Sequence, residues 1–113
     1  MDYTLLLMGN IGQKIAKRVQ GFESKVQYYD SFPLTSEIES SLNVTRVSLD
    51  QLFSTSDIVT CHVPLTKDTY HIVNKKRLDM MKTSGIVINT SRGQVIDEKA
   101  LLLALTDGTI AGA

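Results

Sequence analysis

Short strand-like segments alternate with amphipathic segments along the 113-residue chain. Segments rich in apolar, β-branched and aromatic residues predict strands at 3–8, 24–30, 44–47, 56–63 and 85–90. Apolar residues at helical spacing predict helical segments at 11–21, 48–55, 75–82 and 97–108. Residues 31–43 carry Pro33, several serines and little periodicity, so we expect mostly loop there, with one short turn at most. Residues 109–113 predict the start of one more strand.

The ends of the predicted helices carry residues that suit those positions. Ser48 can cap the second helix with its hydroxyl, and the acids Asp97 and Glu98 suit the positive end of the last helix dipole. Glycines are expected to end the first helix at Gly21 and the last at Gly108. The apolar residues of the first helix share one face: Ile11, Ile15, Ala16 and Val19.

The alternation of strands and helices predicts the fold class. Strands joined through helices cannot be hairpin neighbours, so they pair in parallel, and parallel sheets are covered by helices on both faces. We therefore predict a single α/β domain with a doubly wound parallel sheet, whose last strand is truncated at residue 113. In such sheets, ligands bind beyond the carboxyl ends of the strands.

Charge balance and cysteine content narrow the class of protein. Twelve Lys and Arg residues balance twelve Asp and Glu residues, which argues against a protein that binds nucleic acid or anionic membranes. No apolar run reaches the roughly 20 residues of a membrane span, and no segment is typical of a cleaved signal peptide. Cys61 cannot form an internal disulfide, so we expect a cytoplasmic protein. We expect no metal site.

The segment LLLMGNIGQKIA, residues 5–16, is similar to the phosphate-binding turn between a strand and a helix. That turn reads G-x-G-x-x-G, and Leu7, Gly9 and Gly12 occupy its three glycine positions. The second glycine lets the main chain approach a pyrophosphate, and the third lets the helix pack closely on its strand. Amides at the helix start would then face the phosphate charge. Because Leu7 replaces the first glycine, an ordinary tight turn is the alternative.

Asp30 ends the second predicted strand, about 20 residues after the glycines. A carboxylate at this place accepts hydrogen bonds from a ribose 2′-hydroxyl and repels a 2′-phosphate. It therefore predicts NAD rather than NADP as the cofactor. A solvated aspartate in a turn is the alternative.

The segment INTSRGQVIDEKALLLAL, residues 88–105, brings three polar residues to the end of a predicted strand: Thr90, Ser91 and Arg92. Gly93 then releases the chain. An arginine at this edge can hold a carboxylate through two parallel hydrogen bonds. A surface arginine in a loop is the alternative.

Three segments together resemble a known family: MGNIGQKIAKRVQGFESKVQYYD at 8–30, SDIVTCHVPLTKDTYHIVN at 56–74 and MKTSGIVINTSRGQVIDEKALLLALTDGTIAGA at 81–113. They closely resemble the Rossmann-type NAD-binding domain of the D-isomer-specific 2-hydroxyacid dehydrogenases. That family includes D-lactate, glycerate, phosphoglycerate and formate dehydrogenases and glyoxylate reductases. The resemblance implies an NAD-dependent oxidoreductase in which the complete enzyme transfers hydride between NAD and a 2-hydroxy or 2-oxo acid.

The resemblance also implies roles for the matching residues. Asn10 and Ile11 lie at the helix start over the pyrophosphate, next to Gly9 and Gly12, and Asp30 binds the adenosine ribose. The adenosine and phosphate side is lined by Val63, Pro64 and Thr69. The nicotinamide is flanked by Thr90, Ser91 and Arg92. The last of these matches the catalytic arginine that binds the substrate carboxylate and stabilises charge on the carbonyl oxygen as hydride arrives.

Residues 1–113 carry only part of the family pattern. The catalytic glutamate and histidine of the family are expected beyond residue 113, and the substrate-binding lobe is absent. We therefore expect an incomplete NAD-binding domain that is inactive by itself. His62 and His71 fall in the adenosine-side loop and are interpreted as packed or solvated residues. Cys61 is interpreted as a buried small side chain, and Met80 and Met81 as core residues.

A function of a different class is the alternative. Leu7 also favours a non-catalytic remnant, or a nucleotide-binding module that acts through association. In either case an incomplete sheet is expected to leave apolar surface and an open strand edge exposed. We therefore expect a homo-oligomer.

Overall fold

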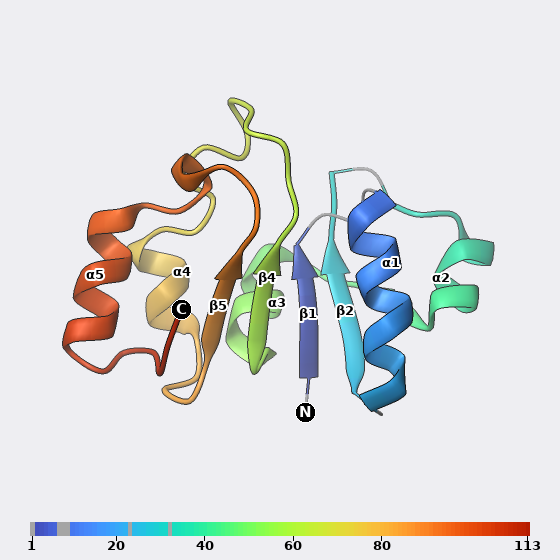
Figure 1. Cartoon of the computed structure of the whole chain (residues 1–113), viewed down its shortest axis with the longest axis horizontal. Coiled ribbons are helices and arrows are strands. Elements are labelled where there is room, and N and C mark those ends of the chain that lie inside the picture. The colour runs from blue at the N-terminus through green and yellow to red at the C-terminus, as the bar shows by residue number, and fades with distance from the viewer. Residues whose placement is uncertain (1, 7–9, 23, 32) are drawn as a thin grey trace.

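The computed structural model of the chain describes residues 2–6, 10–22, 24–31 and 33–113. Within this part of the chain, one parallel sheet contains β1 (Asp2–Leu6), β2 (Lys25–Tyr29), β3 (Val44–Arg46), β4 (Ile58–Cys61) and β5 (Ile86–Asn89). The helices that connect or follow the strands are α1 (Asn10–Val19), α2 (Ser36–Leu42), α3 (Leu49–Thr55), α4 (Lys75–Met80) and α5 (Glu98–Thr106) (Figure 1). The predicted α/β class and parallel pairing are confirmed.

The strand order makes β1 the centre of the sheet. The order is β3-β2-β1-β4-β5, so the chain moves outward from β1 in one direction and then returns to continue in the other. Such a reversal leaves a crevice at the carboxyl ends of the two strands beside it, here β1 and β4, because their connections leave in opposite directions. The topology alone therefore favours this edge as a ligand site.

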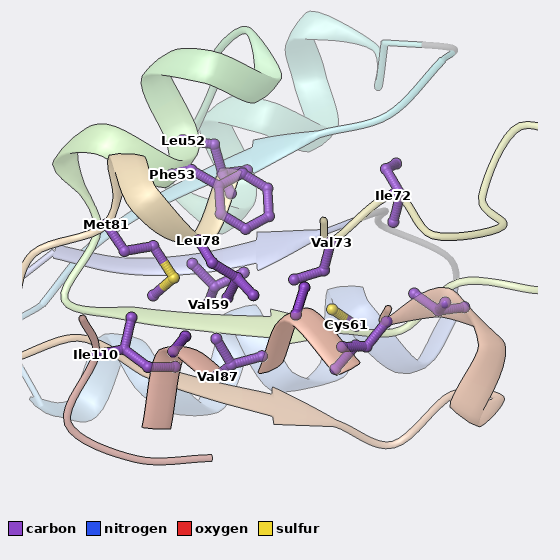
Figure 2. Close-up of a cluster of buried hydrophobic side chains, with 14 of the residues drawn as sticks. Leu52, Phe53, Val59, Cys61, Ile72, Val73, Leu78, Met81, Val87 and Ile110 are labelled. Atoms are coloured by element: carbon purple, nitrogen blue, oxygen red, sulfur yellow. The ribbon is translucent and has the colours of Figure 1, made fainter. Parts of the chain in front are cut away.

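Two clusters of buried side chains hold the helices on the sheet. The larger cluster joins α3, α4 and α5 to β4 and β5, and Figure 2 shows part of it, including Leu52, Phe53, Val59, Leu78 and Val87. The smaller cluster joins α1 and α2 to β2 and β3 through Ala16, Val19, Val26, Tyr28, Leu42 and Val44. Cys61 and Met81 are buried in the larger cluster, and Met80 packs against it, as predicted.

The prediction of loop over residues 31–43 is wrong, because α2 occupies Ser36–Leu42. Thr35 caps this helix by accepting a hydrogen bond from the amide of Ile38, and Asn43 ends it in the left-handed conformation with φ 53°. Ile38 and Leu42, four residues apart, both face the smaller cluster. Ser40 and Ser41 lie between these apolar positions, so the helical spacing of the apolar residues is weak in the sequence.

The first helix also differs from its prediction. Ile15, Ala16 and Val19 do face the sheet, but Ile11 is 67% exposed. The α-helix ends at Val19 and continues as a 3-10 turn, η1 (Gln20–Phe22), so Gly21 lies inside this turn rather than at the helix end. Ile11 belongs to the first turn of α1, and it is not among the residues that form or pack against the smaller cluster in the described part of the chain.

Other predicted ends are confirmed. The Ser48 hydroxyl accepts a hydrogen bond from the amide of Gln51 at 3.1 Å and caps α3, and Gly108 follows α5 with φ +79°. Gly112 pairs with Ile86 as an isolated parallel bridge, which agrees with the start of a further strand. Residues 7–8 of the first predicted strand lie outside the described residues.

Part of the apolar surface remains uncovered. Ile86 and Ile88 of β5 are 38% and 37% exposed, and they alternate with Val87 of the larger cluster, so they face the other side of the sheet. On α5, Leu102 and Leu103 are also exposed. Among the described helices, none has the length and apolar character needed to cross a membrane.

Candidate functional site

Six of the predicted cofactor residues line one hollow of about 480 Å³ at the carboxyl edge of the sheet: Ile11, Gly12, Val63, Pro64, Thr90 and Ser91. They come from three places that are distant in sequence, namely the first turn of α1 and the loops that follow β4 and β5. His62 completes the lining. The exposed side chain of Ile11 thus belongs to this hollow and not to the core.

Ser91 fixes the two loops to one another. Its hydroxyl oxygen accepts a hydrogen bond from the amide of Val63 at 2.7 Å and donates to the carbonyl of Cys61 at 3.0 Å. The Ser91 amide in turn donates to the Asn89 side-chain oxygen at 2.8 Å. These bonds hold one wall of the hollow in place before any ligand arrives.

His62 lies between two threonine hydroxyls. Nε2 is 2.8 Å from the Thr60 hydroxyl, and Nδ1 is 2.8 Å from the Thr90 hydroxyl. A neutral imidazole has one donor and one acceptor nitrogen, and each hydroxyl can serve either. Burial lowers the pKa of His62, so the ring is neutral at pH 7.

His62 lines the hollow, although its sequence position indicated only a packed or solvated residue. The signal for its placement was present in the alternation along β4. Val59 and Cys61 face the larger cluster, so Thr60 and His62 must face the opposite side, toward α1. His71 lies elsewhere, with its ring stacked on Tyr70 at a centroid distance of 3.9 Å.

Arg92 has a fixed main chain and an exposed side chain. Its carbonyl accepts hydrogen bonds from the Asn89 side-chain amide at 3.1 Å and from the Val95 amide at 3.1 Å. The guanidinium therefore extends from a fixed main chain directly after Ser91, but Arg92 itself is not among the residues that line the hollow. An exposed guanidinium at such a place can bind an anion through its fork of donors.

Asp30 follows β2 at the same edge of the sheet and is half-buried. Arg46, the last residue of β3, donates from Nη2 to the main-chain carbonyl of Asp30 at 2.9 Å. The end of β2 is thus held by a cation from the neighbouring strand.

Three predicted contacts are placed differently or not described. The buried Thr69 donates from its hydroxyl to the Pro64 carbonyl at 2.6 Å and accepts from the Thr66 amide at 2.7 Å, so it shapes the loop and does not line the hollow. Gly9 lies outside the described residues. Asn10 begins α1, and its side chain is not among those described.

The lining has the chemistry that a dinucleotide requires. Ile11, Val63 and Pro64 give apolar walls, and the first turn of α1 has main-chain amides without helical partners, which attract phosphate. Thr90 adds an exposed hydroxyl. A larger hollow of about 600 Å³ lies between His71 and the start of α5, but none of the predicted site residues line it.

Cys61 has no part in this chemistry. It is fully buried, and burial raises the pKa of its thiol to about 12. A thiol that remains protonated and inaccessible is a poor nucleophile. Within the described residues, no three His, Cys, Asp or Glu side chains come together as a metal site.

Comparison with known proteins identifies the family. The sequence profile of the D-isomer specific 2-hydroxyacid dehydrogenase, NAD binding domain, matches residues 2–113. A glyoxylate reductase of Korarchaeum cryptofilum is 47% identical over 106 residues, which are 94% of this chain and 32% of that protein. A glyoxylate reductase of Thermococcus litoralis is 48% identical over 105 residues, which are 93% of this chain and 31% of that protein.

Solved structures agree with this comparison. A D-lactate dehydrogenase of Treponema pallidum superimposes with a TM-score of 0.92 at 40% identity, covering 99% of this chain and 33% of that one. An NAD-complexed D-isomer specific 2-hydroxyacid dehydrogenase of Lactobacillus delbrueckii ssp. bulgaricus gives a TM-score of 0.92 at 35% identity, covering 100% of this chain and 34% of that one. The chain therefore spans about a third of the length of its relatives. It belongs to the D-isomer-specific 2-hydroxyacid dehydrogenase family, of which it represents the NAD-binding domain.

Proposed function

We propose that the chain binds NAD in the hollow at the carboxyl edge of the sheet, as part of an oxidoreductase that acts on 2-hydroxy acids. The observation that carries this proposal is the convergence of Ile11, Val63, Pro64, Thr90 and Ser91 on that one hollow. They come from three segments, the first turn of α1 and the loops after β4 and β5, which an extended dinucleotide can contact together. Family membership supports the same cofactor.

Each part of the rim has a distinct task in this proposal. The amides at the start of α1, including those of Asn10, Ile11 and Gly12, bind the pyrophosphate, and Gly9 lets the main chain approach it. Asp30 accepts hydrogen bonds from the adenosine ribose. Val63, Pro64 and the loop supported by Thr69 line the adenosine side, and Thr90 and Ser91 lie beside the nicotinamide.

Arg92 is the catalytic residue that this part of the protein contributes. Bound NAD supplies the hydride acceptor or, when reduced, the hydride donor. The Arg92 guanidinium binds the substrate carboxylate and stabilises negative charge on the carbonyl oxygen of the 2-oxo acid. Residues 1–113 span about a third of the relatives' length and are expected to bind NAD without turning over any 2-hydroxy acid. Robust turnover by the purified 113-residue chain would contradict this part of the proposal.

A titration tests the cofactor assignment. Unfolding of the 113-residue chain is followed with and without millimolar NAD. NAD is expected to raise the melting temperature by mass action, because at a hundredfold excess over Kd it adds about 2.7 kcal/mol to the free energy of unfolding. Asp30→Ala should abolish this protection. Asp79→Ala, which removes an exposed carboxylate from α4, is the matched control and should keep it. No effect of NAD on the wild-type chain would overturn the proposal.

The exposed apolar surface favours the second function, an association module. Ile86 and Ile88 on the sheet and Leu102 and Leu103 on α5 are large apolar side chains open to solvent. Their exposure supports a homo-oligomer in which two copies cover these side chains. Size-exclusion chromatography with light scattering is expected to give more than one protomer for the wild type and a lower mass for Ile88→Glu. A monomeric wild type would rule this association out.

A further inference from the structure

Arg46 brings a positive charge to the place assigned to the adenosine ribose. It is the last residue of β3, and in the register of the two strands it lies opposite Tyr28 of β2. From there its side chain passes the end of β2, where Nη2 donates to the main-chain carbonyl of Asp30 at 2.9 Å. The guanidinium is therefore hydrogen-bonded to the main chain of Asp30, the residue that is proposed to contact the ribose.

The surroundings of Arg46 are rigid. The buried Tyr28 donates from its hydroxyl to Glu39 Oε2 at 2.6 Å and accepts a hydrogen bond from the amide of Leu34 at 3.0 Å. These two hydrogen bonds join α2 and the segment before it to β2, the strand in which Tyr28 lies opposite Arg46. Glu39 and Arg46 line a shared hollow, and the charge of Arg46 is one of the influences that lower the pKa of Tyr28 against the larger raising effect of burial. The guanidinium thus extends from an ordered part of the fold.

Arg46 keeps donors for a ligand. The side chain is exposed, and the bond to the Asp30 carbonyl uses one of the five N–H groups of a guanidinium. Guanidinium groups bind phosphate through two parallel hydrogen bonds, and such charge-assisted bonds are stronger than neutral ones. A carboxylate and a cation at the same ribose position have opposite effects on a 2′-phosphate, because the first repels it and the second attracts it.

We propose that Arg46 is a second residue that determines which dinucleotide the site accepts, by offering a ligand for a ribose 2′-phosphate that Asp30 opposes. The choice of NAD over NADP then results from a balance between two neighbouring residues and not from Asp30 alone. This inference rests on the proposed function, because it requires the dinucleotide to lie with its adenosine ribose at Asp30.

A double-mutant cycle on the 113-residue chain tests the inference. Dissociation constants for NAD and NADP are measured by calorimetry for the wild type, Asp30→Asn, Arg46→Gln and the double variant. Asp30→Asn should improve NADP binding relative to NAD by about tenfold or more, since a like charge is removed. Adding Arg46→Gln should reverse most of that gain, by about tenfold, and should weaken NADP more than NAD. Arg18→Gln, an exposed arginine on α1, is the charge-matched control and should change neither constant.

The outcomes separate the two claims. If Asp30→Asn and the double variant bind NADP equally well, Arg46 does not contact the 2′-phosphate and the inference fails while the proposed function stands. If Arg46→Gln weakens NAD and NADP by the same factor, its role is to hold the main chain of Asp30, which also overturns the inference. If the wild type binds no NAD, the proposed function fails and the inference with it.

Discussion

The side-chain oxygen of Ser91 lies 2.7 Å from the main-chain nitrogen of Val63 and accepts its hydrogen bond. These residues are 28 positions apart in sequence and follow two neighbouring strands, β4 and β5. The same hydroxyl donates to the carbonyl of Cys61. A single side chain therefore satisfies main-chain groups of the other loop and joins the two loops at the wall of the hollow.

Replacement of Ser91 by alanine should loosen this wall. The amide of Val63 loses its acceptor, and a partly buried donor without a partner costs about 1–3 kcal/mol. Urea unfolding should show a loss in that range, and the affinity for NAD should fall as well. Ser84→Ala, in the exposed turn before β5, is the control. Equal stability of the two variants would show that the hydroxyl bridge is unimportant.

Ile11 should contribute to ligand binding and not to stability. Its side chain is 67% exposed and lines the hollow, whereas Ile15, one helical turn later, packs against the smaller cluster. Ile11→Ala should leave the melting temperature nearly unchanged and weaken NAD binding by about tenfold, from the apolar area that a bound dinucleotide would cover. Ile15→Ala should lower the melting temperature and leave NAD binding nearly unchanged. A marked loss of stability in Ile11→Ala would place this side chain in the core after all.

The sequence predicted the strands of the sheet more reliably than which side chains line the hollow at its carboxyl edge. Parallel strands follow from apolar segments separated by helices, because this alternation has few compact arrangements. The position of Ile11 is harder to predict. Helical periodicity indicates a core residue, and only the folded structure shows that Ile11 lines the hollow. The family resemblance, which places Ile11 over the pyrophosphate, agrees better with its place in the hollow than the helical periodicity does.

Local chemistry explains the other differences. The helix α2 was missed because Thr35 and Asn43, which start and end it, are also typical loop residues. The role of His62 is not evident in the sequence because a lone histidine gives no sign of its neighbours, and its contacts come from Thr60 in β4 and from Thr90 after β5. Hydrogen bonds between residues distant in sequence, such as that of Arg46 to Asp30, cannot be read from periodicity.

Tyr28 should contribute a stability that alkaline pH removes. Its hydroxyl bonds both Glu39 and the amide of Leu34, so Tyr28→Phe should cost about 1–3 kcal/mol in the free energy of unfolding. Burial, followed by the bond to Glu39, raises the pKa of this hydroxyl above its ordinary 10.0. The folded state therefore holds the proton more tightly, and this stability is complete below pH 10 and is lost as pH rises through the raised pKa. Tyr70→Phe, an exposed residue, is the control, and an identical alkaline loss in Tyr28→Phe and wild type would contradict the assignment.

His62 should cause a loss of stability on the acid side. Burial lowers the pKa of the imidazole, so the unfolded chain binds a proton more readily than the folded one. The sign follows from linkage: the stabilising effect is complete above the ordinary pKa of 6.5 and is lost as pH falls through the lowered value. We therefore expect urea unfolding of the wild type to show decreasing stability below pH 6.5, and His62→Gln, whose amide can still bond Thr60 and Thr90, to show a smaller decrease. His71→Gln removes the other histidine and should keep the wild-type decrease. If His62→Gln follows the wild type between pH 6.5 and 4.5, burial of His62 does not lower the pKa of its imidazole, and the electrostatic account of this part of the hollow is wrong.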